Sequence, residues 1–309
     1  MEVGSYLVVG EALVDLISEP GSWRFQAVCG GSPLNVAVAL AAAGHPVRLA
    51  SQAGDDLFGQ LLRDHLTRYG VDTRDVIDTG DATNLAFAHL DAAGAAHYDF
   101  RLSWTWPGPV DLTGVDWLHT GSLAAVLDPG AAAVTQAVHT ARRAGIPVSY
   151  DPNVRPVLMR DPATARPVVE RWVAAADLVK VSAEDLAWLY PGVPDLAVAA
   201  DWAERGPALV VVTRGAAGAV ARYRGGVVEC AAPRVRVVDT IGAGDLFTAG
   251  LLSRLADWRP EQPLERPRLV AALRYATALA AAGCARRGAV PPPAADVAAL
   301  LGEEALRGR

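Results

Sequence analysis

The sequence predicts an α/β fold, a three-layer α/β/α sandwich with a mostly parallel central sheet and a small β-sheet lid. Short apolar runs alternate with helical patterns along the 309 residues, as expected when helices connect the strands of a parallel sheet. The composition, 51% hydrophobic and 20% charged, is enough for a large buried core. One segment, residues 83–104, instead alternates apolar and polar residues, which is typical of a β-hairpin.

The elements follow from local patterns. Residues 6–10 are an apolar run that ends at glycine, as in a buried parallel strand. The helix expected over 32–44 has Ser32 as its N-cap, Pro33 in its first turn and Gly44 as its stop. Further strands are expected near 47–54, 116–119, 147–150, 178–181, 208–212 and 235–238, and further helices near 55–70, 129–144, 162–175, 183–190, 244–257, 268–283 and 294–301.

We expect a single domain over residues 1–309, because the chain has no internal repeat and no clear linker. The hairpin would turn at the Ala-Ala-Gly sequence within 83–104. Residues 11–27 could pair with it to form a small β-lid that covers a ligand. The alternative is an ordinary surface hairpin.

Charge and composition argue against several classes of protein. The net charge is −6, the pI is about 5.5 and no basic run occurs, so we expect neither nucleic-acid nor membrane partners. The N-terminal residues lack a basic segment followed by a long apolar one, so we expect no signal peptide. The three cysteines, Cys29, Cys230 and Cys284, are far apart, which favours a reducing cytoplasm.

The stretch VVDTIGAGDLFTAG, residues 237–250, carries the strongest chemical signal. A strand at 235–238 would bring this stretch to the carboxyl edge of the sheet, where α/β folds bind ligands. The N–H groups of Gly242, Ala243 and Gly244 would be free at the start of a helix, and such groups bind anions. They could stabilise the charge on a phosphoryl group in transfer, while Asp245 accepts a proton from the acceptor hydroxyl.

A plainer interpretation is that Asp245 only caps the helix, since Asp is a favoured N-cap residue. Two known glycine motifs do not apply. Phe247 occupies the third glycine position of G-x-G-x-x-G, and no G-K-[ST] sequence of a Walker A loop occurs.

The same stretch closely resembles the carboxyl-terminal signature of the ribokinase-like (PfkB) family of sugar kinases, D-T-x-G-A-G-D. Residues 29–44, CGGSPLNVAVALAAAG, are similar to the family's amino-terminal signature. Further matches follow in the family's order: GEALVD (10–15), DPNVRP (151–156), KVSAEDL (180–186), VVTRGAAGA (211–219) and ARRGAVPPP (285–293). The resemblance implies a ribokinase-like fold and ATP-dependent phosphorylation of a small alcohol. It implies Asp245 as catalytic base and Gly242, Ala243 and Gly244 as the anion hole.

The resemblance also implies where the sugar binds. Asp15 could accept hydrogen bonds from two hydroxyls, Gly30 and Gly31 would let the sugar approach the backbone, and Asn35 could contact a hydroxyl. Taken alone, these residues would be better explained by a tight turn with a capping Asp and a surface Asn. Two arginines could clamp a polar substrate or form surface ion pairs: Arg101 on the hairpin and Arg155 after the strand at 147–150.

The nucleotide and ion sites are implied in the same way. Lys180 is the only lysine, so a phosphate contact must come from it, from arginine or from a metal ion. Ser182 and Asp185 stand where the family has N-x-x-E, with Glu184 adjacent, and these acids would bind Mg²⁺ through water. The other residues implied in ATP binding are Thr213, Gly215, Gly218, Gly244, Cys284 and Gly288. The backbone near Asp239 and Ile241 could hold a monovalent cation such as K⁺.

The combined motifs look most like those of bacterial fructokinases, so fructose is the first expected substrate. A 2-keto-3-deoxygluconate kinase is the alternative, with Arg101 and Arg155 holding the acid group. A sensor that binds sugar or nucleotide without catalysis is a third possibility. Lid sheets of this kind often pair between subunits, so we expect a homodimer.

Overall fold

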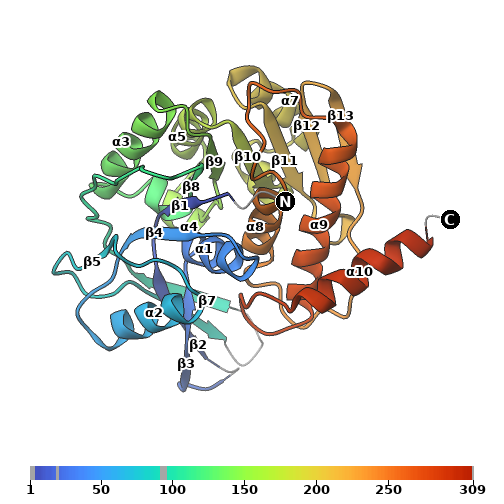
Figure 1. Cartoon of the computed structure of the whole chain (residues 1–309). Coiled ribbons are helices and arrows are strands. Elements are labelled where there is room, and N and C mark those ends of the chain that lie inside the picture. Colours follow the sequence, from blue (N-terminus) through green and yellow to red (C-terminus); the bar gives the residue numbers. More distant parts are fainter. Residues whose placement is uncertain (1–3, 19–20, 91–95, 308–309) are drawn as a thin grey trace.

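The structure is a computed structural model, and it describes residues 4–18, 21–90 and 96–307. A large 9-stranded sheet forms its centre, and a smaller 4-stranded sheet extends from one edge (Figure 1). The strands of the large sheet, in spatial order, are β13 (Gly226–Cys230), β12 (Ala219–Tyr223), β11 (Leu209–Thr213), β10 (Leu178–Ser182), β9 (Val148–Asp151), β8 (Trp117–Gly121), β1 (Tyr6–Val9), β4 (Val47–Gln52) and β5 (Val76–Ile77). The seven strands β11, β10, β9, β8, β1, β4 and β5 pair in parallel, and β12 and β13 add an antiparallel hairpin beside β11. The predicted three-layer α/β/α architecture is confirmed.

Helices cover both faces of the large sheet, because strand side chains alternate between the faces. In β1, Tyr6 and Val8 pack toward one face and Leu7 and Val9 toward the other, and all four are buried. The helices on the first face are α1 (Ser32–Ala42), α2 (Leu57–Arg68), α8 (Ala243–Arg254), α9 (Arg266–Cys284) and α10 (Ala294–Arg307). Those on the second face are α3 (Gly130–Arg143), α4 (Pro156–Met159), α5 (Pro162–Ala175), α6 (Ala183–Leu189) and α7 (Asp195–Arg205).

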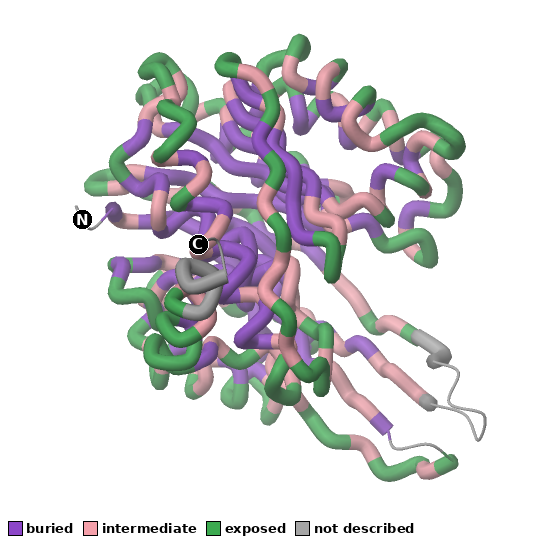
Figure 2. Tube along the Cα trace, turned by 90° about the vertical axis from the view of Figure 1, so that its right-hand side faces the viewer, coloured by how far each residue is buried: buried purple, intermediate pink, exposed green. Residues whose placement is uncertain are grey.

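The small sheet has the strand order β3 (Phe25–Gly30), β2 (Leu13–Ser18), β6 (Leu85–Leu90) and β7 (Ala96–Arg101). β6 and β7 pair as an antiparallel hairpin with Leu85 opposite Arg101, as predicted. β2 lies parallel to β6 and antiparallel to β3. The expected Ala-Ala-Gly turn lies outside the described residues. Figure 2 shows these strands reaching away from the buried centre, with mostly intermediate and exposed residues.

One predicted strand of the large sheet was wrong. Residues 235–238 form no strand. This apolar run does not pack into the sheet, since Val237 and Val238 are 61% and 52% exposed. The backbone N–H of Val238 donates to the carbonyl of Cys284 instead. The hairpin β12–β13 completes that side of the sheet, and helix α7 was not predicted.

Helix α8 is buried on all sides rather than on one face. Its residues from Asp245 to Ser253 are all buried, including Phe247 and Leu251. It packs closely against α9, because Gly250 lets the two backbones approach. A Cβ at Gly250 would lie 2.9 Å from the Cα of Ala276. Among the described residues, no helix combines the length and apolarity needed to cross a bilayer.

The α8–α9 contact gives a stability prediction. Gly250→Ala should lower the free energy of unfolding by about 1–3 kcal/mol, because the added methyl group overpacks the helix interface. Gly302→Ala, in exposed α10, is the matched control, since nothing lies within 4 Å of a Cβ there. It should be neutral or stabilising by up to about 1 kcal/mol. Urea unfolding of both variants checks this; equal effects would refute the close packing.

Candidate active site

The sequence-predicted site residues gather at the carboxyl edge of the large sheet. Strands β1 and β8 are neighbours in space but far apart in the chain, so the topology reverses between them. Ligands of open α/β sheets bind at such a point, beyond the carboxyl ends of the strands. The residues that follow or end the strands there include Glu11, Gly121, Asp151 and Ser182. The N-terminus of α8 meets this edge.

Asp245 lies in the first turn of α8, and it is held by two side chains of α1. Its Oδ1 accepts a hydrogen bond from Ser32 Oγ at 2.6 Å, and its Oδ2 accepts one from Asn35 Nδ2 at 2.8 Å. Burial raises the pKa of Asp245, against the opposing effects of Ser32, Asn35 and Lys180. The site therefore holds a desolvated carboxylate whose orientation is fixed.

The helix start at Ser32 differs from the prediction. Gly31 is the N-cap of α1, and no side chain caps this end. The hydroxyl of Ser32 donates to Asp245 instead, 213 residues away in sequence. The Ser32 hydroxyl could cap the helix or bond to a distant residue, and only the packing of α1 against α8 decides between the two roles. Ser32 is thus a site residue that sequence reasoning missed.

The glycines before Asp245 are required by close contacts. Gly242 has a φ of +74° and is the N-cap of α8, and a Cβ there would lie 2.3 Å from Ala289 Cβ. A Cβ on Gly244 would lie 3.1 Å from Lys180 Nζ. Ala243 is the first residue of the helix. The N–H of Ala243 donates to the carbonyl of Thr240 at 3.2 Å, so it is not free as predicted. Gly242 and Gly244 place backbone N–H groups at a helix N-terminus beside a buried cation, an arrangement that favours an anion.

Lys180 is buried beneath this helix start and forms an ion pair with Asp151. The distance from Nζ to Asp151 Oδ2 is 2.5 Å, and both side chains are at most 5% exposed. Burial alone would lower the pKa of Lys180, but Asp151 and, further off, Asp245 and Asp185 raise it. The lysine therefore keeps its charge at neutral pH. Its ion pair with Asp151 keeps it charged, and this pair was not predicted from the sequence.

The acidic segment after β10 is organised as a capping box. Ser182 Oγ accepts from the N–H of Asp185 at 2.9 Å, and the Asp185 carboxylate accepts from the N–H of Ser182. Burial and Asp151 raise the pKa of Asp185, while Lys180 lowers it. Glu184 is exposed. Both roles weighed for Ser182, helix cap and site residue, are compatible with this geometry.

The donor set fits a magnesium ion that keeps most of its waters. Within the described part of the chain, no three His, Cys, Asp or Glu side chains cluster to hold a metal alone. Mg²⁺ is commonly bound by one or two carboxylates, substrate phosphates and water. Asp185 and the exposed Glu184, next to the anion-favouring helix start, supply carboxylates of that kind.

Asp15 lies on β2 beside the glycine pair. A Cβ on Gly30 would lie 2.1 Å from Asp15 Oδ2, so only glycine allows the carboxylate its position. Gly31 has a φ of +100°, and a Cβ there would lie 2.6 Å from the carbonyl oxygen of Glu11. Burial raises the pKa of Asp15 to about 6, with Arg155 lowering it and Asp245 raising it. Asp15, Arg155 and Asp245 therefore share one electrostatic environment.

The two candidate arginines are placed differently. Arg155 donates to the carbonyls of Asn153 and Val154, is exposed, and acts on Asp15 through its charge. Arg101 is at the end of β7 and is bound to Asp99 on its own strand, with 2.7 Å between Nη1 and Oδ1. Among the described contacts, none joins Arg101 to Asp15 or Asp245. The structure thus brings Arg155, but not Arg101, to the carboxylates.

The residues expected near a nucleotide lie along the β11–α9 side of the same edge. Thr213 ends β11, and Gly215 begins a short turn with open space where its Cβ would be. Gly218 is explained by packing, since a Cβ there would lie 2.0 Å from the carbonyl of Cys230. The carboxylate of Asp239 accepts from two backbone N–H groups, of Ile241 at 3.0 Å and of Gly288 at 2.8 Å.

Cys284 completes this loop, because its carbonyl accepts from the N–H groups of Val238 and Asp239. The side chain of Asp239 is thus committed to shaping the loop. The monovalent cation predicted from the sequence could therefore bind only the backbone carbonyls of Asp239 and Ile241, and not the Asp239 carboxylate.

Glu11 is a further buried acid that sequence reasoning left unassigned. Its Oε2 accepts from the N–H of Ala124 at 3.0 Å, and the hydroxyl of Ser122 also bonds to it. Ser122 Oγ in turn accepts from Asn153 Nδ2 at 3.2 Å. Burial raises the pKa of Glu11 to about 7, against these hydrogen bonds. Glu11 thus joins the loops that follow β1, β8 and β9. Its position in GEALVD was the only available signal.

Comparison with known proteins agrees with this geometry. The pattern of the pfkB family carbohydrate kinases matches residues 4–295. The chain belongs to that family. It is therefore a carbohydrate kinase with the ribokinase-like fold, as the sequence motifs implied.

Several relatives within the pfkB family are fructokinases. The chain is 37% identical over 262 residues to a fructokinase of Klebsiella pneumoniae, covering 82% of this chain and 85% of the relative. A fructokinase of Xylella fastidiosa, solved with ATP, has a TM-score of 0.84 at 29% identity, covering 97% of this chain and 99% of that one. A double mutant of Vibrio cholerae O395 fructokinase, solved with fructose, ADP and potassium, has a TM-score of 0.84 at 28% identity, covering 97% and 98%.

The buried acid Glu11 gives a pH prediction. Its pKa is about 7 in the folded chain against an ordinary value of 4.5, so the folded state keeps a proton that the unfolded chain releases. The contribution of Glu11 to stability is therefore greatest below pH 4.5 and declines as the pH rises to 7. The stability of the native chain relative to Glu11→Gln should fall by about 3 kcal/mol over this window.

Urea unfolding between pH 4.5 and 8 measures this difference. Glu204→Gln, at an exposed position of α7, controls for loss of one carboxylate. Parallel curves for the native chain and Glu11→Gln would contradict the prediction.

Proposed function

We propose that this chain is an ATP-dependent fructokinase that transfers the γ-phosphoryl group of ATP to a hydroxyl of fructose. The observation that carries the proposal is the fixed carboxylate of Asp245 at a glycine-built helix N-terminus. Its hydrogen bonds to Ser32 and Asn35 leave it facing the carboxyl edge where Asp15 lies. The fructokinase relatives at 32–37% identity support fructose as the acceptor.

In this mechanism Asp245 orients the acceptor hydroxyl and takes its proton as the bond to phosphorus forms. A loose transition state releases the proton late, so a positioned carboxylate suffices. The backbone N–H groups of Gly242 and Gly244 would then stabilise the charge on the phosphoryl oxygens, and that of Ala243 would first have to leave the carbonyl of Thr240. The buried cation of Lys180, next to Gly244, adds to the same positive potential.

Sugar recognition is assigned to the residues around Asp15. Its carboxylate would accept hydrogen bonds from sugar hydroxyls, and Gly30 and Gly31 would let the sugar approach the backbone. Asn35 would contribute to positioning Asp245 as well as to sugar contact, because its amide is bonded to that carboxylate. Arg155 lies near enough to affect Asp15 electrostatically.

ATP would lie along the β11–α9 side of the edge, near Thr213, Gly215 and Gly288. The structural role found for Gly218 weakens its assignment as a nucleotide contact. Mg²⁺, held through water by Asp185 and Glu184, would neutralise phosphate charge. A K⁺ ion would bind the backbone carbonyls of Asp239 and Ile241, in the loop fixed by the Asp239 carboxylate.

The acid-sugar alternative is less well supported. A 2-keto-3-deoxygluconate kinase would need Arg101 and Arg155 to converge on one carboxylate. Arg101 is instead paired with Asp99 on an exposed strand end. A non-catalytic sensor would have no need of a desolvated base, and the Asp245 environment argues against it.

The working unit would be one kinase domain over the whole chain, with the small sheet as its lid. A homodimer in the cytoplasm is proposed, formed through this lid.

The lid carries an aromatic group made of the exposed Trp23 and the half-buried Phe25, Phe87 and His89. Trp23 is 79% exposed and stacks on His89 with ring centroids 4.6 Å apart, and Phe25 contacts Phe87 edge-on. Exposed apolar groups of this kind mark association surfaces.

The first experiment measures ADP release with Mg-ATP and a panel of fructose, other hexoses, ribose, adenosine and 2-keto-3-deoxygluconate. Fructose should give the highest kcat/KM. Asp245→Asn should lower kcat about 10²–10⁴-fold while the KM values change little, because the base is removed and the sugar contacts remain. Asp64→Asn on exposed α2 is the matched control.

Turnover by Asp245→Asn at the native rate would refute Asp245 as the base. Turnover by the native chain with the acid sugar alone would keep the mechanism and overturn fructose as the substrate. No turnover on any substrate, with sugar binding intact, would favour the sensor.

The dimer is tested by analytical ultracentrifugation. The native chain should sediment as a dimer, and Trp23→Ser should weaken association at least about tenfold, since it removes an aromatic side chain that is 79% exposed on the lid. Leu57→Ser is the matched control, because Leu57 is 78% exposed on α2. A native chain that stays monomeric at all concentrations would refute the proposal.

A further inference from the structure

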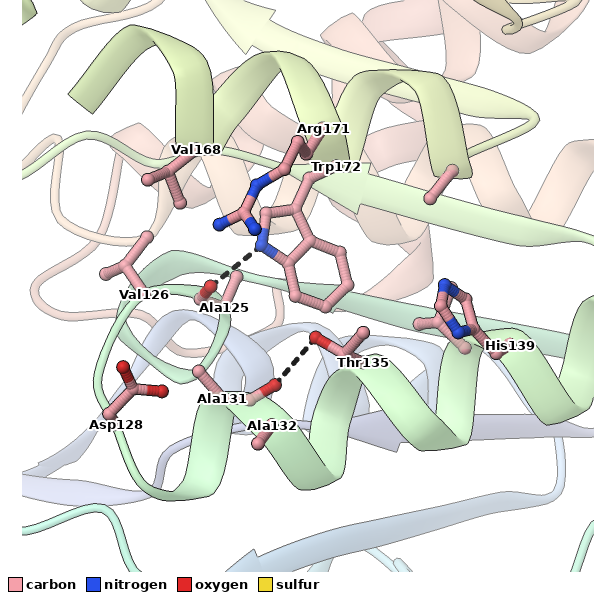
Figure 3. A pocket seen from close by; sticks show the side chains of 12 residues that line it. Ala125, Val126, Asp128, Ala131, Ala132, Thr135, His139, Val168, Arg171 and Trp172 are labelled. Carbon is pink, nitrogen blue, oxygen red and sulfur yellow. Dashed lines mark hydrogen bonds between the residues drawn. The ribbon is translucent and has the colours of Figure 1, made fainter. Parts of the chain in front are cut away.

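A groove runs between α3 and α5 on the second face of the molecule, outside the candidate active site (Figure 3). Its volume is about 550 Å³, and a second hollow of about 420 Å³ adjoins it toward the C-terminal ends of both helices. This is the size of a small-molecule site. Its floor is formed by small side chains, among them Ala131, Ala132 and Ala175, which keep the groove open.

Both ends of the groove are closed by hydrogen bonds between elements. At one end lies the short helix η1 (Ser122–Ala125), where the carbonyl of Ala125 accepts from Trp172 Nε1 at 2.7 Å. At the other end, Arg142 on α3 donates to the carbonyl of Ala174 on α5 at 3.0 Å. The buried bond of Trp172 makes the η1 end of the groove a built feature of the fold, and the exposed side chain of Arg142 bridges the two helices at the other end.

The charges in the groove are unevenly distributed. Arg171 reaches over it between Val168 and Trp172 in Figure 3, and no described carboxylate pairs with its guanidinium. His139 lies on the facing helix, and Arg143 is in the adjoining hollow. Arg142 and Arg143 also serve the C-terminal turn of α3, where cations are favoured. Arg171 lies a full turn before the end of α5, so the helix terminus does not explain it.

The side of the groove that α3 and the turn before it form is polar and acidic. Asp128 is exposed there, close to the η1 end. Thr135 donates its hydroxyl hydrogen to the carbonyl of Ala131 at 2.9 Å, so its oxygen can still accept a hydrogen bond. In Figure 3 the indole of Trp172 forms an apolar wall between the guanidinium of Arg171 and His139.

We propose that this groove binds a phosphorylated polyol, of the chemical class of a sugar phosphate. Arg171 would hold the phosphate through its paired N–H donors. Asp128 and Thr135 would accept hydrogen bonds from hydroxyls, and Trp172 would contact the C–H face of the chain or ring. This site lies outside the catalytic centre and does not depend on the proposed function.

The groove is joined to the candidate active site through η1. Its residue Ala125 bonds to Trp172, its residue Ala124 bonds to Glu11, and its residue Ser122 bonds to Asn153 in the loop that carries Arg155. An occupant of the groove thus contacts the same turn that supports the substrate side of the site. The hydrogen bonds of η1 thus connect the proposed phosphate site to the loops of the candidate active site.

Calorimetric titration with glucose 6-phosphate tests the proposal, using the native chain with Mg-ADP present to occupy a nucleotide site. Arg171→Gln should weaken binding at least tenfold. Arg224→Gln, which removes one exposed arginine from the turn between β12 and β13, should not. Asp128→Asn should weaken binding of glucose 6-phosphate but not of inorganic phosphate. Thermal unfolding checks that each variant is folded.

Loss of binding in Arg171→Gln alone supports the groove as the site. Equal affinity in Arg171→Gln and Arg224→Gln would overturn it. The absence of binding by the native chain at about 10 mM ligand would overturn it too, because even weak binding is detected at this concentration. Inorganic phosphate binding as tightly as glucose 6-phosphate would overturn the polyol part of the assignment.

Discussion

The buried ion pair between Lys180 and Asp151 is the interaction on which the catalytic edge depends. Three carboxylates, of Asp151, Asp185 and Asp245, lie in one poorly hydrated region, and Lys180 acts electrostatically on all of them. Such a pair gives little net stability, but removing one partner costs about 3–5 kcal/mol, because a buried charge is left unpaired. The only lysine of the chain therefore makes it possible to keep a charged base out of water.

Close backbone contacts are the second constraint. Gly30 makes room for the Asp15 carboxylate, Gly244 for the Lys180 ammonium and Gly242 for Ala289. In each case a methyl group would displace a charged side chain or a neighbouring segment. The glycines at the start of α8 and α1 thus also set the positions of the acids and the cation around them.

The core of the site follows closely from sequence where the signal is local. A glycine turn, an acid in the first turn of a helix and the parallel β/α rhythm are patterns of a few residues. Helices α8 and α1 and the parallel strands β1, β4, β8, β9, β10 and β11 were found from them, whereas β5, β12 and β13 were not. Errors arose where one local pattern fits two environments. The run 235–238 has the apolar character of a buried strand but lies exposed beside Cys284. Ser32 has the character of a helix cap but bonds to Asp245.

By itself the sequence determined the α/β class, the helix start at Gly242–Gly244 and the acid beside it, because short-range periodicity and turn chemistry encode them. The tertiary structure alone decided the partners of that acid, the Lys180–Asp151 pair and the bridge that Glu11 makes between three loops. These contacts join residues 29 to 213 positions apart, and their geometry is set by the order of strands in the sheet. No local pattern carries that order, so the chemistry of the edge becomes defined only when the sheet assembles.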